Sequence, residues 1–407
     1  MTKRTVKSGQ KGTFTVLAVL VAISTLGATS TQMFLPALPA MQSTFGASST
    51  TAQLTLSAAM FAMAFSQIIY GPWSDRVGRK PVLFFGLTLY VIGTVVCLSA
   101  GNVQIMIFGR ILQACGGGVG AVLAGAIAVG KYGSANAAPV ISLVAAVMAI
   151  GPMLAPSIGG ILTDTIGWRS VFAVMLGLGV LVIVVATLLL PETRLQKQTA
   201  ATPGQSLRVF ASLLKSRTFM AYGLNAAFSM GAFFAFISAA PFVTVNIFER
   251  PSTEFGLWFV SIAIGYVVGN LLSAKMVKQK GGDWLIGVGS LLLLAATFAM
   301  PLMLQVGGWT PWAIFLPAAV MSFAAGLSIP NAQAAAIGHL PMAAGTASSL
   351  IGFLMLMSGA IASQIVGIMQ DGTPWPMVIT MALMGFLSLA AFIARNKVQT
   401  KNVLISV

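Results

Sequence analysis

The chain has 407 residues, of which 57% are hydrophobic and 7% are charged. A soluble globular domain carries roughly 25% charged residues, so this composition excludes an ordinary soluble protein. The net charge of +15 is a feature of nucleic-acid-binding proteins, but here the basic residues are scattered between long apolar runs. A run of about 20 apolar residues crosses a bilayer as a helix, and the sequence therefore indicates a helical membrane protein.

Twelve such runs follow one another along the chain. They cover residues 14–38, 52–72, 81–99, 104–130, 137–162, 168–190, 219–245, 255–277, 284–304, 311–332, 345–369 and 374–394. The first run follows a basic start, as in a signal peptide, but it is long and lacks an obvious small-residue cleavage site. We interpret it as a membrane helix. The predicted fold class is an all-α polytopic membrane protein with twelve transmembrane helices.

The basic residues predict the orientation of these helices. With the N-terminus inside, nineteen of the twenty-two Lys and Arg residues fall in cytoplasmic segments, and Arg110 lies within a helix. This asymmetry is typical of a multi-pass protein with both termini in the cytoplasm, here of a bacterial inner membrane. The charge then orients the chain in the lipid bilayer, and we expect no nucleic-acid partner. Cys97 and Cys115 lie within predicted helices as small apolar residues, so we expect no disulfide, metal site or cofactor.

The loop between the second and third predicted helices carries four charges within six positions. It resembles motif A of the major facilitator superfamily (Gly-x-x-x-Asp-Arg-x-Gly-Arg-Lys/Arg) at every position. The matching residues are Gly71, Asp75, Arg76, Gly78, Arg79 and Lys80. The resemblance implies that this loop latches the cytoplasmic side in the outward-facing state. Its charged residues are then expected to exchange partners as the carrier changes conformation, and not to bind substrate.

One long connection, residues 191–218, is polar and basic and separates six predicted helices from six. Two six-helix halves joined by a central cytoplasmic loop are the organisation of the superfamily that motif A indicates. We expect an N-terminal half at 1–190, the central loop at 191–218 and a C-terminal half at 219–407.

Two predicted helices carry further motifs. Arg110 and Gln113 in the fourth helix resemble motif B. An arginine about 9 Å deep, at about 1.5 Å per residue, is costly unless it meets a partner or a wet cavity, although snorkelling to the outer surface is the alternative. The fifth helix resembles motif C of antiporters, which implies an exporter and a seal against ion leakage. Its residues are Gly151, Pro152, Pro156, Gly159 and Gly160.

The end of the first helix, residues 30–39, resembles the bicyclomycin and chloramphenicol resistance (Bcr/CflA) branch of drug/proton antiporters, as do residues 330–333 and 344–350. The resemblance covers about residues 14–394. This chain departs from the branch at Gln32, where an aspartate is usual, and an amide cannot titrate. Its depth in the helix matches that of Arg110, so we expect Gln32 and Arg110 to meet across the cavity.

Proton coupling needs a group that binds and releases a proton between the two access states, yet no acidic residue lies deep in a predicted helix. Three alternatives stay open. Asp164, Glu249 or Glu254 folds into the outer vestibule; His339 titrates near neutral pH in a short inside loop; or coupling is weak and an anionic substrate neutralises Arg110.

Polar and aromatic residues of the first, second, fourth and seventh helices are the predicted lining of a substrate and coupling cavity. They are Gln32, Phe34, Gln67, Tyr70, Arg110, Gln113, Tyr222, Asn225, Phe228 and Phe234. We expect a monomeric secondary active transporter, not an enzyme, that exports small amphiphilic compounds such as phenicols in exchange for protons. The alternative is an exporter or facilitator of an anionic metabolite with weak or no proton coupling.

Overall fold

The computed structural model describes residues 2–132, 151–190, 210–338 and 344–405, and these residues are almost entirely helical. The helices are α1 (Thr2–Phe34), α2 (Leu38–Phe45), α3 (Ser49–Val77), α4 (Arg79–Leu98), α5 (Val103–Tyr132), α7 (Arg169–Leu189), α9 (Arg217–Phe242), α10 (Ser252–Lys280), α11 (Gly282–Val306), α12 (Pro311–Gly338), α13 (Ala344–Met369) and α14 (Trp375–Ile405). A further helix covers residues 151–165. The 3-10 turn η1 (Leu35–Ala37) joins α1 to α2, and the π-helical turn η2 (Val243–Ile247) follows α9.

Eleven spans in the described part of the chain are long and apolar enough to cross a membrane. They correspond to eleven of the twelve predicted helices. The remaining one, at 137–162, lies only partly within the described residues, where 151–162 are helical. The first span runs from Ala18 to Phe45, beyond its predicted end. Pro36 and Pro39 end the regular helix at Phe34, because proline lacks an N–H group, and the chain continues through η1 into α2.

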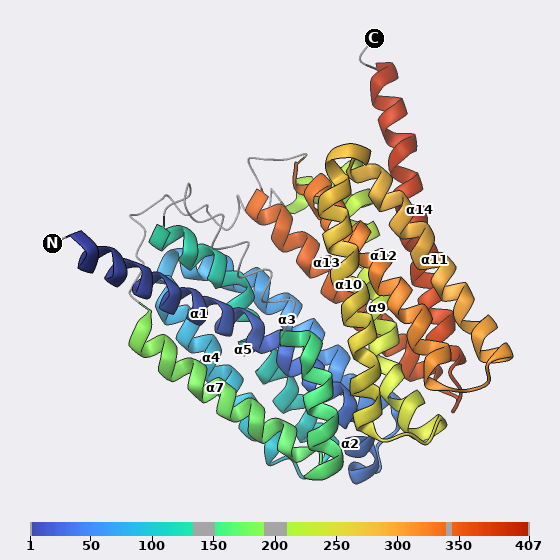
Figure 1. Cartoon of the computed structure of the whole chain (residues 1–407), viewed down its shortest axis with the longest axis horizontal. Coiled ribbons are helices and arrows are strands. Elements are labelled where there is room, and N and C mark those ends of the chain that lie inside the picture. Colours follow the sequence, from blue (N-terminus) through green and yellow to red (C-terminus); the bar gives the residue numbers. More distant parts are fainter. Residues whose placement is uncertain (1, 133–150, 191–209, 339–343, 406–407) are drawn as a thin grey trace.

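The helices form two bundles, one from α1 to α7 and one from α9 to α14 (Figure 1). In the first bundle, α5 packs against α1, α3 and α4. This packing depends on small residues: a Cβ atom on Gly27 of α1 would lie 2.6 Å from the carbonyl oxygen of Gly117 on α5. Small residues let membrane helices approach this closely, as no larger side chain fits between the two backbones.

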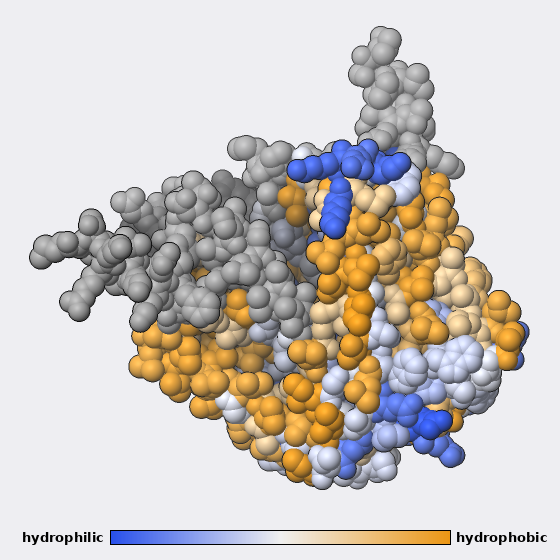
Figure 2. Space-filling view, in the orientation of Figure 1, coloured by the Kyte–Doolittle hydropathy of each residue, from blue (hydrophilic) through white to orange (hydrophobic). Residues whose placement is uncertain are grey.

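The surface is that of a protein surrounded by lipid. Figure 2 shows hydrophobic residues over the middle of the visible face and hydrophilic residues towards its two ends. Large apolar side chains point outwards from several helices; Leu188 is 75% exposed and Phe298 is 62% exposed. An apolar band between two polar ends matches the hydrocarbon layer of a bilayer between its headgroup regions.

The two bundles join at one end of the molecule. We call the end with α2 and the start of α10 the far end, and the end with Gly71–Lys80 the motif A end. At the far end, Thr50 of α3 donates a 2.9 Å hydrogen bond to the carbonyl of Gly367 on α13. Gln53 of α3 donates a 2.7 Å bond to the carbonyl of Ser238 on α9. Figure 1 shows the bundles meeting at α2 and diverging towards the opposite end.

A candidate substrate cavity between the two bundles

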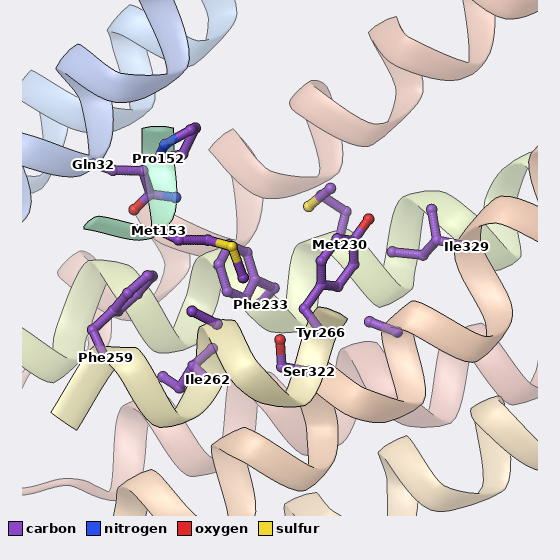
Figure 3. A pocket seen from close by; sticks show the side chains of 12 residues that line it. Gln32, Pro152, Met153, Met230, Phe233, Phe259, Ile262, Tyr266, Ser322 and Ile329 are labelled. Carbon is purple, nitrogen blue, oxygen red and sulfur yellow. The ribbon is translucent and has the colours of Figure 1, made fainter. Parts of the chain in front are cut away.

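A cavity of about 280 Å³ lies between the two bundles, and its walls come from α1, residues 151–165, α9, α10 and α12 (Figure 3). Its lining residues are Gln32, Pro152, Met153, Met230, Phe233, Phe259, Ile262, Ala263, Tyr266, Ser322, Ala325 and Ile329. Both bundles contribute, so a rocking motion of one bundle against the other would reshape the cavity.

Gln32 enters the cavity from α1, close to the point where Pro36 interrupts the helix. Figure 3 shows its amide turned towards Met153 and the ring of Phe259. The Oε1 atom is buried and accepts no hydrogen bond from the residues that the structure describes. A buried acceptor without a partner is unusual in a folded protein, and a polar group of this kind at the wall of a cavity is suited to a ligand.

Aromatic and thioether groups make up much of the remaining wall. The rings of Phe233 and Phe259 lie edge to face with their centroids 6.5 Å apart. Tyr266 and Ser322 are the other residues with a polar side chain among the twelve. None of the six acidic residues in the described segments lines this cavity. Such a wall favours apolar and aromatic compounds over ions.

Arg110 lies outside this cavity, in a cluster of its own. Its side chain is 1% exposed and its guanidinium lies 4.6 Å above the ring of Phe34. It donates a 2.5 Å bond to Gln113 Oε1 and a 3.4 Å bond to the carbonyl of Thr55. The predicted pairing of Gln32 with Arg110 is therefore absent, because Arg110 turns towards α3 and its own helix. Within the described part of the chain, its Nη2 atom has no hydrogen-bond partner.

Two predicted cavity residues of α9 lie inside the second bundle instead. The Asn225 amide donates to the Ser290 hydroxyl at 2.8 Å and to the Ser388 carbonyl at 2.9 Å. The Tyr222 hydroxyl donates to Asp283 at 2.7 Å and is in contact with Arg395. Polar side chains in a membrane bundle pair with one another where they can, so polarity alone did not identify the face of α9 that lines the cavity.

The other predicted lining residues also contact neighbouring helices. Phe34 packs on Phe172, Gln67 lies between α5 and α13, and the Tyr70 hydroxyl donates to the Cys115 carbonyl at 2.9 Å. Phe228 packs against the core, and Phe234 lies against Gly359 of α13. On α9 the cavity is lined by Met230 and Phe233.

Two of the motif C residues, Pro156 and Gly160, contact the second bundle at the far end. A Cβ atom on Gly160 would lie 2.5 Å from the carbonyl oxygen of Ser252, at the start of α10. From the other side, a Cβ atom on Gly256 would lie 2.6 Å from the carbonyl oxygen of Pro156. Ser157 also donates a 2.8 Å bond to the Gly256 carbonyl. Gly159 packs against the Met33 backbone of α1, and Gly151 against Thr29 and Thr25.

Asp164 extends this contact. Its carboxylate accepts hydrogen bonds from the backbone amides of Ser252 and Thr253, at 3.2 Å and 2.6 Å, and from the Thr253 hydroxyl at 2.7 Å. These amides are at the N-terminus of α10, where they lack partners within the helix. A carboxylate of the first bundle thus caps a helix of the second bundle.

At the motif A end the sequence of the loop has a clear local role. Gly78 has φ of 110° and joins α3 to α4, a conformation that favours glycine. Arg79 is buried at the start of α4, whereas Asp75 and Arg76 are exposed. Lys80 donates a 3.0 Å bond to the carbonyl of Leu190, beyond the end of α7. Gly71 has open space around its Cα.

The remaining candidates for proton coupling lie at the surface or outside the described residues. Glu254 is 3.9 Å from Arg250 in an i,i+4 ion pair and accepts a bond from Trp258. Glu249 is exposed with φ of 55°. His339 lies outside the described residues.

Sequence reasoning missed the contribution of α10 and α12 to the cavity. Tyr266 and Ser322 are their polar residues in its wall, and each stands alone in an apolar stretch. One polar residue in each of two membrane helices is a weak indication of a cavity wall. The first, second, fourth and seventh helices carry more polar residues and were therefore predicted to line the cavity instead.

Residues 20–363 match the model of the major facilitator superfamily. The chain belongs to this superfamily. Superfamily members with similar sequences include a bicyclomycin resistance protein homolog of Haemophilus influenzae, 28% identical over 94% of this chain and 96% of that protein. A chloramphenicol resistance protein of Pseudomonas aeruginosa is 30% identical over 85% of this chain and 82% of its own length. Multidrug resistance protein D of Escherichia coli is 25% identical over 91% and 93%.

These relatives agree with the predicted Bcr/CflA branch of the superfamily and with a multi-pass protein of the bacterial inner membrane.

Solved structures share the fold. A D-xylose–proton symporter superposes with a TM-score of 0.72 at 15% identity, over 93% of this chain and 96% of that one. A bacterial homolog of the human lysosomal transporter Spinster, inward-facing and occupied, superposes with a TM-score of 0.70 at 18% identity over 96% of each chain.

Proposed function

We propose that the protein exports small amphiphilic organic compounds, phenicol-like compounds among them, by alternating access in exchange for protons. The observation that carries this proposal is the cavity between the two bundles, with its aromatic and methionine walls and few polar groups. Cavities of this kind bind lipophilic compounds through apolar contact and orient them by a small number of hydrogen bonds. The resistance proteins among the relatives support the same class of substrate.

In this proposal both termini are cytoplasmic, the far end faces the periplasm, and the conformation is the inward-facing one. The halves at 1–190 and 219–407 rock against each other, joined by the loop at 191–218. Contacts such as those of Gln53 and Asp164 close the periplasmic side. The exposed position of Asp75 supports a latch that forms only after the cytoplasmic side closes.

Proton exchange is the proposed source of energy. The resemblance of residues 151–160 to motif C supports an antiporter, and the packing of these residues on α10 supports a seal. Among the open alternatives, Asp164 has the most support. Its three hydrogen bonds to the second bundle exist only while the far end is closed, so its surroundings change between the two access states.

Everted membrane vesicles containing the protein test this proposal. We expect labelled chloramphenicol to accumulate in vesicles with an acidic interior and to leave when the pH gradient is collapsed. Vesicles from cells without the protein are the control. Accumulation that is indifferent to the gradient would rule out proton exchange while leaving export in place. Equal uptake with and without the protein, for chloramphenicol and a panel of other amphiphilic compounds, would rule out export.

A second candidate is export of an anionic metabolite, and one observation favours it. Arg110 Nη2 has no hydrogen-bond partner, and no carboxylate in the described segments is within ion-pair distance of Arg110. A buried cation is stabilised by an anionic partner. In this alternative, Arg110→Gln abolishes transport of the anion, whereas the first proposal predicts that transport of uncharged compounds survives this substitution in part.

A further inference from the structure

The cavity lining bears on which compounds are accepted. We propose that the cavity selects small uncharged aromatic compounds that donate a hydrogen bond to Gln32, and that it excludes lipophilic cations. The proposal rests on the export function above, since it concerns the same cavity. It identifies Gln32 as a residue that determines specificity.

The hydrogen-bonding state of Gln32 favours ligands that donate a hydrogen bond. The Oε1 atom of Gln32 is buried and has no partner among the described residues, and the side chains of its neighbours in Figure 3, Met153 and Phe259, have no N–H or O–H group to offer. Burying an acceptor without a donor is costly. A ligand with an N–H or O–H group removes that cost when it binds. A ligand without such a group excludes water from Gln32 Oε1 and gives this oxygen no hydrogen bond in return.

The uncharged wall of the cavity disfavours charged ligands. None of the twelve lining residues is acidic or basic. A cation that enters must lose its water, and the cavity offers it aromatic rings and a few uncharged oxygen atoms, such as Gln32 Oε1, which replace only part of the lost hydration. Arg110 offers nothing to an anion here, because Phe34 covers its guanidinium and Arg110 does not line the cavity. An uncharged ligand avoids both penalties.

The size and shape of the cavity also limit which ligands fit. At about 280 Å³, the cavity is just below the range of about 300–1,000 Å³ in which most drug-sized ligands bind. The edge-to-face rings of Phe233 and Phe259 present an aromatic surface, and Met153 and Met230 adjust their shape to a ligand. This arrangement favours compounds with one or two rings.

Three probes test the proposal by equilibrium binding to the purified full-length protein in lipid nanodiscs. Chloramphenicol is uncharged and has O–H and N–H donors, a fully methylated derivative of it has none, and tetraphenylphosphonium is a lipophilic cation. We expect the protein to bind chloramphenicol about tenfold more tightly than the methylated derivative, as one hydrogen bond allows, and to show no saturable binding of the cation.

Two substitutions separate the contributions of the hydrogen bond and the charge. Gln32→Leu is expected to lower the affinity for chloramphenicol to that for the methylated derivative, whose own affinity stays within about twofold. Gln32→Glu is expected to create binding of tetraphenylphosphonium that weakens as the pH falls and the new carboxylate is protonated. The same two changes at Gln104, an exposed glutamine at the start of α5, are the controls and should alter no affinity.

Several results would overturn the proposal. They are binding of the cation as tight as that of chloramphenicol, a preference for chloramphenicol that survives Gln32→Leu, or failure of Gln32→Glu to bind the cation in a protein that still binds chloramphenicol. Uptake into everted vesicles separates this proposal from the export function. Equal uptake of the cation and chloramphenicol would retain export and refute charge selection, whereas uptake of none of the three probes would refute both.

Discussion

The carboxylate of Asp164 accepts two hydrogen bonds from Thr253, one from the backbone amide at 2.6 Å and one from the hydroxyl at 2.7 Å. Asp164 belongs to the first bundle and Thr253 to the first turn of α10 in the second. The partial positive charge of a helix N-terminus stabilises a carboxylate. This contact therefore holds the far end closed, and it must break whenever that end opens.

We predict that Asp164→Asn shifts the protein towards the state that is open at the far end. The amide keeps one acceptor but loses the charge, which at this exposed position costs about 1 kcal/mol, or about fivefold in the equilibrium between states. The measurement is the rate of maleimide labelling of Ser157→Cys, a position in the closed contact, with Cys97 and Cys115 replaced by alanine. We expect labelling to accelerate by about that factor.

The matched control is Asp371→Asn. Asp371 is also an exposed acid at the far end, but its hydrogen bonds go to Thr373 in its own turn. This substitution should leave the labelling rate unchanged. If the two variants label Ser157→Cys at the same rate, the contact between Asp164 and α10 does not hold the bundles together.

A bulkier residue at Gly160 should block the transport cycle. A Cβ atom there would lie 2.5 Å from the Ser252 carbonyl oxygen, so Gly160→Val prevents the close contact with α10. We expect transport to fall by more than about tenfold, because the inward-facing state is lost, while the protein still folds. Gly177→Val is the control, since nothing lies within 4 Å of that position. Normal transport by Gly160→Val would show that this close approach is dispensable.

Arg110→Lys should destabilise the protein even though it keeps the charge. The planar guanidinium binds Gln113 and the Thr55 carbonyl at once and lies over the ring of Phe34, and an ammonium group cannot do all three. We expect a loss of about 2 kcal/mol, seen as a lower midpoint of thermal unfolding in detergent. Arg217→Lys, at an exposed arginine at the start of α9, should change the stability by less than about 0.5 kcal/mol. Equal effects would contradict this role for Arg110.

The pair Asp283–Arg395 should be coupled in stability. Arg395 is buried and forms an ion pair with Asp283, a residue at the start of α11 whose side chain is half exposed. Removing Asp283 leaves a buried cation with weaker compensation, so Asp283→Asn should cost about 1–2 kcal/mol, less than for a fully buried pair. A double-mutant cycle with Arg395→Gln measures the coupling. If the two substitutions change the free energy of unfolding additively, the ion pair between Asp283 and Arg395 does not stabilise the fold.

The order and the approximate ends of eleven helices could be predicted because each apolar run is long enough to cross a bilayer and no other structure satisfies its backbone there. The side-chain contacts between the helices were harder to predict. Asn225 is polar in a membrane helix, as a cavity residue would be, but Ser290 and Ser388 satisfy it inside the bundle. Nothing in its own sequence neighbourhood distinguishes these two outcomes.

Gln32 shows what sequence could predict about the site. Gln32 lines the cavity between the bundles, whereas its expected partner, Arg110, contacts Gln113 and Phe34. Depth in a helix follows from counting residues, but rotation about the helix axis depends on neighbours from distant parts of the chain. The cavity residues of α10 and α12 depend on such packing and were missed for that reason.

The central claim is that compounds leave the cell through the cavity at Gln32. Its most direct test is the accumulation of labelled chloramphenicol in cells that lack other efflux pumps, with the wild-type protein or with Ala263→Phe, which fills the cavity wall. We expect the wild-type protein to lower the accumulation of chloramphenicol several-fold. We expect Ala263→Phe, present in the membrane in equal amount, not to lower it. Equal lowering by both proteins would contradict the central claim.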